Sequence, residues 1–470
     1  MEKLFKIKES GSTVRNEIIA GLTTFMAMAY ILFVNPSMFA DLANGDAGFY
    51  SAIFVATALS AVIGTVLIGL LANLPLAQAS GMGLNAFFVY TVCFGLGFTY
   101  ANALLFVLAD GLIFIILTAT GLRKVIFDAI PKRVRKIIPA GIGLFIAFIG
   151  FQDAGIVIAD SSTGVALASF NLLGSATWAT VMPLIVTIVA VFVIAVLSKL
   201  KVKGAILWSV LGAAVVYYIL GYLTVPEFAG ISLAVANPLD AFKNFGNLAF
   251  GKVFTEGFDF SAYLAKHDVL SLVISFATTA LAFCMVDMFD TMGTLYGACK
   301  SGNLLIKDEE GNEEIPRINQ AMLADAVATC TGAVCGTSTV TTYVESSAGC
   351  AAGGKTGLAA IVTGIMFFIS MFLSPVAALI PSCAYAAALI YVGILMMGCV
   401  KDIQWDNPSV ALPSFLTLVM MAFTYNISYG IAFGLLSHIF IKVFTGKIKD
   451  VKISTWVITI LFTAMFFLTH

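Results

Sequence analysis

The sequence predicts an all-α polytopic membrane protein with 14 transmembrane segments, arranged as two inverted repeats of seven. Of its 470 residues, 60% are hydrophobic and 11% are charged, and the mean hydropathy is +1.00. These values lie far outside the range of soluble globular proteins. Apolar runs long enough to cross about 30 Å of hydrocarbon recur along the whole chain. The two halves also share the same order of strong and weak apolar runs.

Gly, Pro and charged residues separate the apolar runs and delimit the predicted spans. In the first half, strong runs cover residues 17–36, 50–72, 98–120, 137–155, 178–198 and 204–224, and a weak run covers 79–92. In the second half, strong runs cover residues 271–298, 318–334, 355–378, 383–400, 410–425 and 427–445, and a weak run covers 337–350.

A single membrane domain follows from these spans, since no polar stretch is large enough for a separate soluble domain. It divides into a first repeat at 1–224, an external connection at 225–269, a second repeat at 270–446 and a tail at 447–470. The tail contains an apolar stretch at 453–469. The sequence leaves open whether this stretch spans the membrane.

The positions of Lys and Arg predict the orientation, because these residues collect in cytoplasmic loops. With the N-terminus inside and both weak runs counted as crossings, all but Lys243, Lys252 and Lys266 of the 25 Lys and Arg fall inside. We therefore predict a multi-pass protein of the cytoplasmic (inner) membrane with a cytoplasmic N-terminus. A net charge of −1 without a basic patch argues against nucleic acid as a partner.

Short matches between the halves indicate an internal duplication. Thr23-Thr24 matches Thr278-Thr279, and the same offset places Asn35 opposite Asp290. Because seven is odd, the second copy must enter the membrane from the opposite side.

The two weak runs are candidates for the substrate site. Residues 78–88 and 336–349 both mix polar side chains with Gly or with β-branched Thr and Val, and each holds the same place in its half. Non-helical backbone at membrane depth is tolerated only where protein or a water-filled cavity satisfies it, as in the broken helices of carriers. The alternative is close helix packing without a ligand, because Gly and Ser also serve that purpose.

Three acidic residues accompany these runs. Asp287 and Asp290 are three residues apart and share a helix face, and Glu345 lies in the second weak run. Ionisable residues at membrane depth are costly and mark functional sites. Carboxylates that converge on one cavity oppose each other's ionisation, so one of them is expected to hold a proton near neutral pH. A carboxylate also accepts hydrogen bonds from the ring N–H groups of a base.

Other polar residues in apolar runs carry weaker signals. Asp110 and Asp325 are interpreted as structural, since neither has a clear partner in sequence. The eight Cys are scattered, and the three His show no metal-binding spacing. Motifs for phosphate binding, nucleophile elbows and zinc proteases are absent. The sequence thus predicts a transporter rather than an enzyme, without a cofactor or metal, that runs on an ion gradient.

The motifs at 23–36, 81–88, 287–295 and 336–346 resemble those of the AzgA-like purine permeases. These are hypoxanthine, guanine and adenine carriers related to the xanthine/uracil permeases (nucleobase:cation symporter-2). The resemblance runs from about Gly11 to Lys442. It implies proton symport of a purine base by alternating access, with a core domain and a gate domain. It also implies short strands in the third and tenth segments, and a homodimer formed through the gate domain.

The family's substrate-binding carboxylates carry over to Asp290, or its neighbour Asp287, and to Glu345, and its third-segment Asn carries over to Asn85. The family places the acidic residue three before a Gly, and Gly293 follows Asp290 at that spacing, so Asp290 ranks above Asp287. The same three carboxylates are the predicted proton carriers.

Four further residues complete the predicted substrate site. Gly83 and Thr339 belong to the two weak runs at residues 78–88 and 336–349 (the interrupted segments). Phe25 or Phe88 is expected to stack on the base. The alternatives are a uracil or xanthine symporter, and an anion carrier or channel of the same fold. No basic residue lies near 80–88 or 337–349, which disfavours the anion carrier.

Overall fold

Each predicted span corresponds to a helix or to a strand followed by a helix. The computed structural model describes residues 2–121, 130–228, 230, 237–307 and 313–468. The spans of the first half are α2 (Val14–Met28) with α3 (Ile31–Ala40), α4 (Ala47–Leu71), β1 (Gln78–Ser80) with α5 (Met82–Ala86) and η2 (Phe87–Gly95), α6 (Tyr100–Thr120), α8 (Lys132–Asp153), α9 (Trp178–Lys199) and α10 (Ala205–Thr224). The spans of the second half are α14 (Val269–Ser301), α15 (Ile318–Cys335), β6 (Val340–Thr342) with α16 (Ser346–Ala351), α17 (Gly357–Ser370) with η4 (Met371–Leu373) and α18 (Ser374–Ala377), α19 (Ser382–Met396) with η5 (Met397–Asp402), α20 (Pro408–Phe423) and α21 (Ile427–Phe444).

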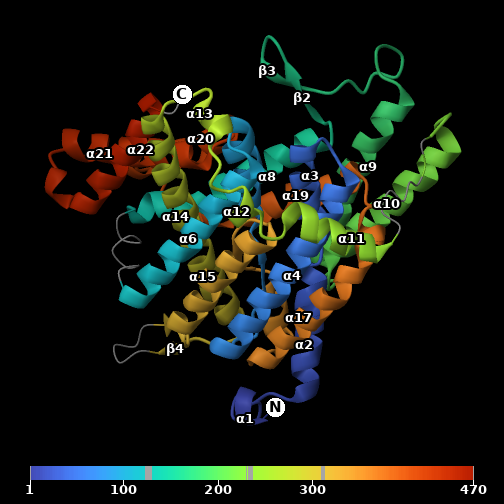
Figure 1. Cartoon of the computed structure of the whole chain (residues 1–470), viewed down its shortest axis with the longest axis horizontal. Helices are drawn as coiled ribbons and strands as arrows, with labels where there is room; N and C mark the ends of the chain where they lie inside the picture. Colours follow the sequence, from blue (N-terminus) through green and yellow to red (C-terminus); the bar gives the residue numbers. More distant parts are fainter. Residues whose placement is uncertain (1, 122–129, 229, 231–236, 308–312, 469–470) are drawn as a thin grey trace.

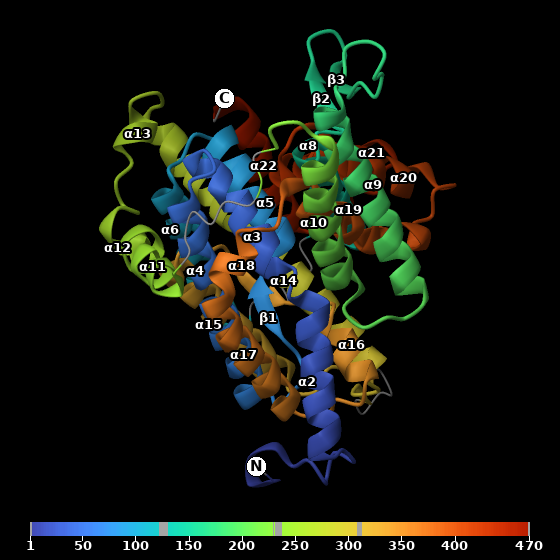
Figure 2. The same cartoon turned by 90° about the vertical axis from the view of Figure 1, so that its right-hand side faces the viewer.

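Short elements connect these spans. They are α1 (Glu2–Phe5), η1 (Asp41–Ala43), β2 (Val157–Asp160), β3 (Gly164–Leu167), α11 (Pro238–Asn244), η3 (Phe245–Ala249), α12 (Lys252–Thr255), α13 (Ser261–Leu264), β4 (Ile306–Lys307), β5 (Glu313–Glu314) and η6 (Ile448–Asp450). In Figures 1 and 2, α1 lies at the bottom of the molecule and the β2–β3 hairpin lies at the top. The helix α1 and the β2–β3 hairpin therefore lie at opposite ends of the helix bundle.

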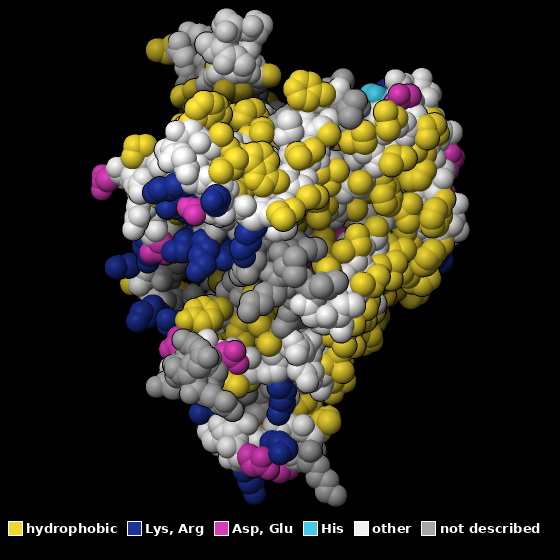
Figure 3. All heavy atoms as spheres, turned by 90° about the vertical axis from the view of Figure 1, so that its left-hand side faces the viewer, with side chains coloured by type: hydrophobic (Ala, Val, Ile, Leu, Met, Phe, Trp, Pro, Cys, Tyr) yellow, Lys and Arg dark blue, Asp and Glu magenta, His cyan; other side chains and the backbone are white. Residues whose placement is uncertain are grey.

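The surface confirms a multi-pass membrane protein. Among the described residues, ten helices have the length and hydropathy to cross a membrane, and shorter apolar helices lie at Met82–Gly95, Pro408–Phe423 and Ile453–Ala464. Figure 3 shows a broad hydrophobic surface on the right of that view, with Lys and Arg gathered at the left and the bottom. Large apolar side chains such as Phe192, Leu223 and Phe423 are more than half exposed, as expected where lipid covers the surface.

The two interrupted segments pair with each other at the centre of the molecule. β1 runs antiparallel to β6, with Gln78 opposite Thr342 and Ser80 opposite Val340, and both strands are fully buried. A strand this short in a membrane needs a partner for its N–H and C=O groups, and each segment supplies the other. Figure 2 shows β1 enclosed by helices. The predicted strands in segments three and ten are thus confirmed.

The spans form two packed groups, which match the predicted core and gate domains. In the core, α17 packs on α2 and α4, and α15 packs on α4 and α6. In the gate, α8 packs on α19 and α20, and α9 packs on α10 and α19. Figure 2 shows the core group on the left and the gate group on the right. β1, β6, α5 and α16 lie with the core, on the side that meets the gate.

The apolar stretch of the tail forms α22 (Ile453–Leu468). Its 16 residues extend about 24 Å as a helix, less than the roughly 30 Å of a hydrocarbon core. The helix packs against α14 and α21, and Phe462 is fully buried there. α22 therefore braces the outside of the bundle.

Close contact between core helices depends on small residues. An added Cβ at Gly357 in α17 would lie 1.9 Å from the carbonyl oxygen of Gly69 in α4. The two backbones can approach this closely only without a side chain at the contact, a common device in membrane helix packing.

Replacing Gly357 with valine should therefore destabilise the protein. Overpacking costs about 1–3 kcal/mol, so we expect the thermal unfolding midpoint of the detergent-solubilised protein to fall by several degrees. Gly212→Val is the matched control, because no atom lies within 4 Å of a Cβ built at Gly212 in α10. Equal midpoints for the two variants would contradict the close-contact explanation.

Candidate functional site

A cavity of about 480 Å³ lies between the core and the gate, next to the paired strands. Its volume falls within the range of small-molecule sites. The core contributes Ala27, Tyr30, Gly81, Met82, Gly83, Phe289, Asp290, Gly293, Thr294, Thr341, Thr342, Tyr343, Val344, Glu345, Ser347 and Ala348 to the lining. The gate contributes Pro139, Val392, Leu395 and Met396, all of them apolar.

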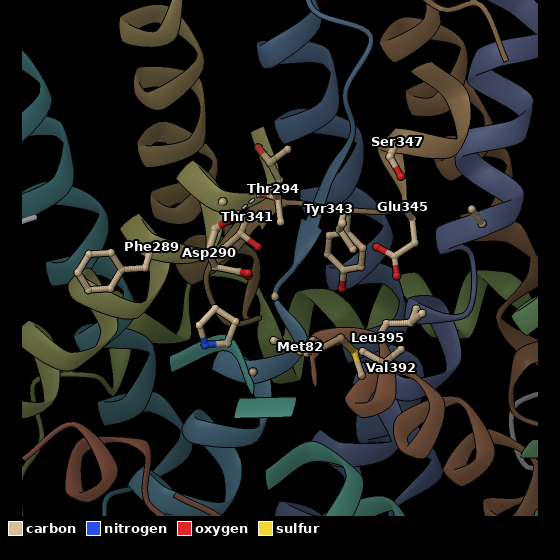
Figure 4. A pocket seen from close by; sticks show the side chains of 18 of the residues that line it. Met82, Phe289, Asp290, Thr294, Thr341, Tyr343, Glu345, Ser347, Val392 and Leu395 are labelled. Carbon is tan, nitrogen blue, oxygen red and sulfur yellow. Dashed lines mark hydrogen bonds between the residues drawn. The ribbon is translucent and has the colours of Figure 1, made fainter. Parts of the chain in front are cut away.

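Two of the predicted carboxylates line this cavity. Asp290 projects from α14, and Glu345 lies between β6 and α16. Figure 4 shows Asp290 and Glu345 on opposite sides, with the ring of Tyr343 between them. Both acids are partly exposed, and the surface that exposes them is that of the cavity. The arrangement offers two separated hydrogen-bond acceptors across an apolar space.

Two tyrosine hydroxyls donate hydrogen bonds beside the cavity. The hydroxyl of Tyr30, in the turn between α2 and α3, donates to Oε1 of Glu345 at 2.6 Å. The hydroxyl of Tyr343 donates to the carbonyl oxygen of Ser80 at 2.5 Å. Charge-assisted hydrogen bonds are the stronger kind, so Tyr30 holds the carboxylate in one orientation.

Asn85 lies behind the cavity, outside its lining. The hydroxyl of Ser338 donates to Oδ1 of Asn85, and Nδ2 of Asn85 donates to the carbonyl oxygen of Ser80 at 3.4 Å. Asn85 thus links α5 to the chain that leads into β6. In this conformation it positions the two interrupted segments.

Asp287 also lies outside the lining. It is fully buried, and its Oδ2 accepts a hydrogen bond of 3.2 Å from Thr329 in α15. A residue three positions along an α-helix is rotated by about 60°. This rotation separates Asp290, which reaches the cavity, from Asp287, which points into the core.

Gly83 lines the cavity at the contact between core and gate. A Cβ at this position would lie 2.4 Å from Cγ2 of Ile142 in α8. Thr339 is fully buried and does not reach the cavity. The interrupted segments therefore contribute to the site mainly through Gly81, Met82 and Gly83 on one side and residues 341–345 on the other.

The two predicted stacking residues pack elsewhere. Phe25 meets Phe367 edge to face at 5.2 Å, and Phe88 meets Phe39 at 4.8 Å. The aromatic residues of the lining are Tyr30, Phe289 and Tyr343, and Figure 4 shows the ring of Phe289 pointing away from Tyr343 and Glu345. The sequence carried a signal for Phe289, which adjoins Asp290, and for Tyr343, which lies two residues before Glu345.

Asp325 in α15 is held by hydrogen bonds that join it to both interrupted segments. Nε2 of Gln78 in β1 donates to it at 2.8 Å and Oγ1 of Thr342 in β6 at 3.3 Å. Oγ1 of Thr291 in α14 donates to its second oxygen at 2.7 Å. This arrangement gives Asp325 the structural role that the sequence favours for it.

A second cavity, of about 440 Å³, leads away from the first. The two share Ala27, Glu345, Ala348 and Leu395 in their linings. The second cavity reaches the turn between α9 and α10, where Nζ of Lys203 donates to Oγ1 of Thr23 at 3.2 Å. The second cavity thus adjoins the candidate site on the side of the α9–α10 turn.

Core and gate also make contact at η2. Oγ1 of Thr91 in η2 donates to the carbonyl oxygen of Tyr425, between α20 and α21, at 2.5 Å. The rings of Tyr90 and Tyr425 lie 6.3 Å apart. These contacts join the C-terminal part of the third segment to the gate.

The cavity offers carboxylates and no cationic group. Neither Lys, Arg nor His is among the described residues that line it. The described residues also contain no group of three or more His, Cys, Asp or Glu suited to a metal ion. The site can accept hydrogen bonds from a neutral or cationic ligand, and it opposes an anion.

Comparisons with known proteins agree with this geometry. Residues 15–433 match the model of a family described as "Permease family", the xanthine/uracil permeases. The chain is 39% identical over 459 residues to the guanine/hypoxanthine permease PbuG of Bacillus subtilis (strain 168), and the match covers 96% of each chain. It is 35% identical over 463 residues to the adenine permease AdeQ of Escherichia coli (strain K12), covering 98% of this chain and 95% of that one.

A solved structure confirms the predicted inverted-repeat fold. The chain superposes on the transmembrane domain of a cyanobacterium bicarbonate transporter, BicA, with a TM-score of 0.57 and 15% identity. The match covers 87% of this chain and 96% of that chain. At this identity the likeness concerns the fold alone.

The part-buried Tyr30–Glu345 hydrogen bond should contribute to stability. A hydrogen bond to a charged group is worth about 1.5–3 kcal/mol, so Tyr30→Phe should lower the thermal unfolding midpoint of the ligand-free protein. Tyr296→Phe is the matched control, since Tyr296 donates to Glu313 at 2.7 Å in an exposed pair. A midpoint for Tyr30→Phe no lower than that of Tyr296→Phe would show that the part-buried bond has little net effect.

Proposed function

The chain belongs to the xanthine/uracil permease family and is a transporter rather than an enzyme, and we propose that it imports purine bases by proton symport. Hypoxanthine, guanine and adenine are the proposed substrates. Two relatives that match over almost their whole length are named guanine/hypoxanthine permease and adenine permease. The proposed energy source is the proton gradient, without a cofactor.

The pair of carboxylates across an apolar cavity is the observation that carries this proposal. A purine is a flat apolar ring system with N–H donors and ring-nitrogen acceptors at its edge. Asp290 and Glu345 accept from the donors, while Tyr343, whose ring lies between them, supplies aromatic surface for a ring face. A protonated carboxyl group also donates to a ring nitrogen.

Asn85, Asp287 and Thr339 act from behind the cavity in this proposal. Their buried hydrogen bonds or close packing set the positions of the interrupted segments. The lining residue Gly83 keeps the space at the core–gate contact open.

Transport follows from alternating access between core and gate. With the N-terminus in the cytoplasm of an inner-membrane protein, the second cavity connects the base site with the cytoplasm. The conformation is then inward-facing, and the Thr91–Tyr425 contact closes the outer side. The gate also carries the surface through which a homodimer would form.

A uracil or xanthine symporter of the same family is the second candidate function. The whole-chain matches to purine permeases favour purines over these bases. A competition panel of unlabelled bases against labelled hypoxanthine separates the two functions.

Glu345→Gln and Asp290→Asn should each impair uptake of radiolabelled hypoxanthine in cells that lack their own purine permeases. Each change removes a charge-assisted hydrogen bond worth about 1.5–3 kcal/mol, so we expect affinity to fall about 10- to 150-fold. Asp240→Asn is the control, because Asp240 forms an exposed ion pair with Lys243. Uptake that survives both cavity substitutions would remove the carboxylates from the site.

Uphill uptake should also depend on the proton gradient. A protonophore is expected to abolish accumulation of the labelled base, because it collapses the proton gradient that drives uptake. Accumulation is measured in intact cells with and without the protonophore, and cells that lack the protein give the background. Accumulation that persists after collapse of the gradient would exclude proton symport.

A further inference from the structure

Asp110 is buried in the middle of α6, and the thiol of Cys284 in α14, a weak donor, is its side-chain hydrogen-bonding neighbour. Its side chain is fully enclosed, and neither carboxylate oxygen has another hydrogen-bond partner among the described residues. Buried polar groups at membrane depth normally find partners, because an unpaired one is strongly destabilising. The structural role that the sequence favours for Asp110 therefore has no strong hydrogen bond among the described residues behind it.

The neighbours of Asp110 are acids and thiols. α6 packs against α14 and α15. Cys284 and Asp287 interact with it from α14, and Asp325 and Cys330 interact with it from α15. No basic side chain of the described residues interacts with this carboxylate.

Two other elements packed against α6 supply no counter-charge. Lys252 of α12 forms an ion pair with Glu256, and Cys93 of η2 faces Tyr100. The negative charge of an ionised Asp110 would thus remain uncompensated within the described part of the chain.

Asp287 also has a carboxylate oxygen without a hydrogen-bond partner among the described residues, whereas Asp325 does not. Oδ1 of Asp287 has no hydrogen-bond partner among the described residues, while both oxygens of Asp325 accept hydrogen bonds. Two interacting carboxylates with unpaired oxygens and no cation cannot easily both be ionised. A single proton removes their mutual repulsion.

The pair is linked to the cavity by α14 and by β6. Asp287 and Asp290 are successive acids on α14, separated by a helical rise of about 4.5 Å. Thr329 donates to Asp287 at 3.2 Å and lies 3.3 Å from the carbonyl oxygen of Val340 in β6. The next residue of that strand, Thr341, lines the cavity. A change of charge on Asp287 therefore changes the electrostatic potential at the cavity.

We propose that Asp110 and Asp287 form a proton-binding pair behind the cavity, which takes up the coupling proton while Asp290 and Glu345 hold the base. This inference rests on the proposed proton symport. Uptake adds one O–H to one of the two carboxylates and reduces the charge of the pair by one. Asp110 touches neither the base nor the cavity, so it acts in coupling and not in recognition.

Transport in proteoliposomes tests this division. The experiment compares accumulation of labelled hypoxanthine under an inward proton gradient with exchange of labelled for unlabelled hypoxanthine in the absence of a gradient. Asp110→Asn should lose accumulation entirely and keep exchange within about threefold of the original protein. Asp268→Asn is the control, because Asp268 is an exposed cap of α14 whose bond to the Ser271 N–H an asparagine can also make.

Two results for Asp110→Asn would overturn the inference. One is accumulation equal to that of the original protein, and the other is loss of both accumulation and exchange in a folded protein. If Asp110→Asn does not fold, Asp110→Ser, which also removes the carboxylate, is measured in the same way and the same results decide. If the unsubstituted protein itself does not accumulate base under a proton gradient, the proposed function fails first.

Discussion

The antiparallel pairing of β1 with β6 is the constraint on which the rest of the structure depends. Each strand interrupts a membrane segment and leaves peptide groups that lipid cannot satisfy. The register of Gln78 with Thr342 solves this problem for both segments at once. It also brings together one segment from each half of the chain, and the cavity lies beside the place where they meet.

Buried polar side chains then fix the paired strands to their surroundings. Asp325 takes hydrogen bonds from Gln78 and Thr342, one residue on each strand, and Asn85 accepts from Ser338 across the same junction. These hydrogen bonds favour one arrangement, since a slip in register would break the bonds of Asp325 to both strands. Glu345 lies three residues beyond β6, so its place in the cavity is set by the strand register.

Much of this could be predicted from the sequence. Hydropathy located the spans, and the composition of residues 78–88 and 336–349 identified the two interruptions. The rotation of a side chain about a helix was harder to predict, because it depends on packing that one sequence does not display. Asp287 and Asp290 could not be separated by apolar pattern alone, and the family spacing ranked them. Phe25 and Phe88 were chosen by residue type and place, but they pack against Phe367 and Phe39, while Tyr30 reaches Glu345 from a turn.

The division of the cavity lining between the two domains has a consequence for how such carriers diversify. Among the described residues, every polar side chain of the lining belongs to the core, and the gate contributes the apolar residues Pro139, Val392, Leu395 and Met396. The side chains that can distinguish one ligand from another therefore belong to the core, whereas the gate presents an apolar surface to the ligand. Selection for a new ligand can act on the core, while selection for turnover or for working temperature acts on the gate. Ligand preference and turnover can therefore change independently during evolution.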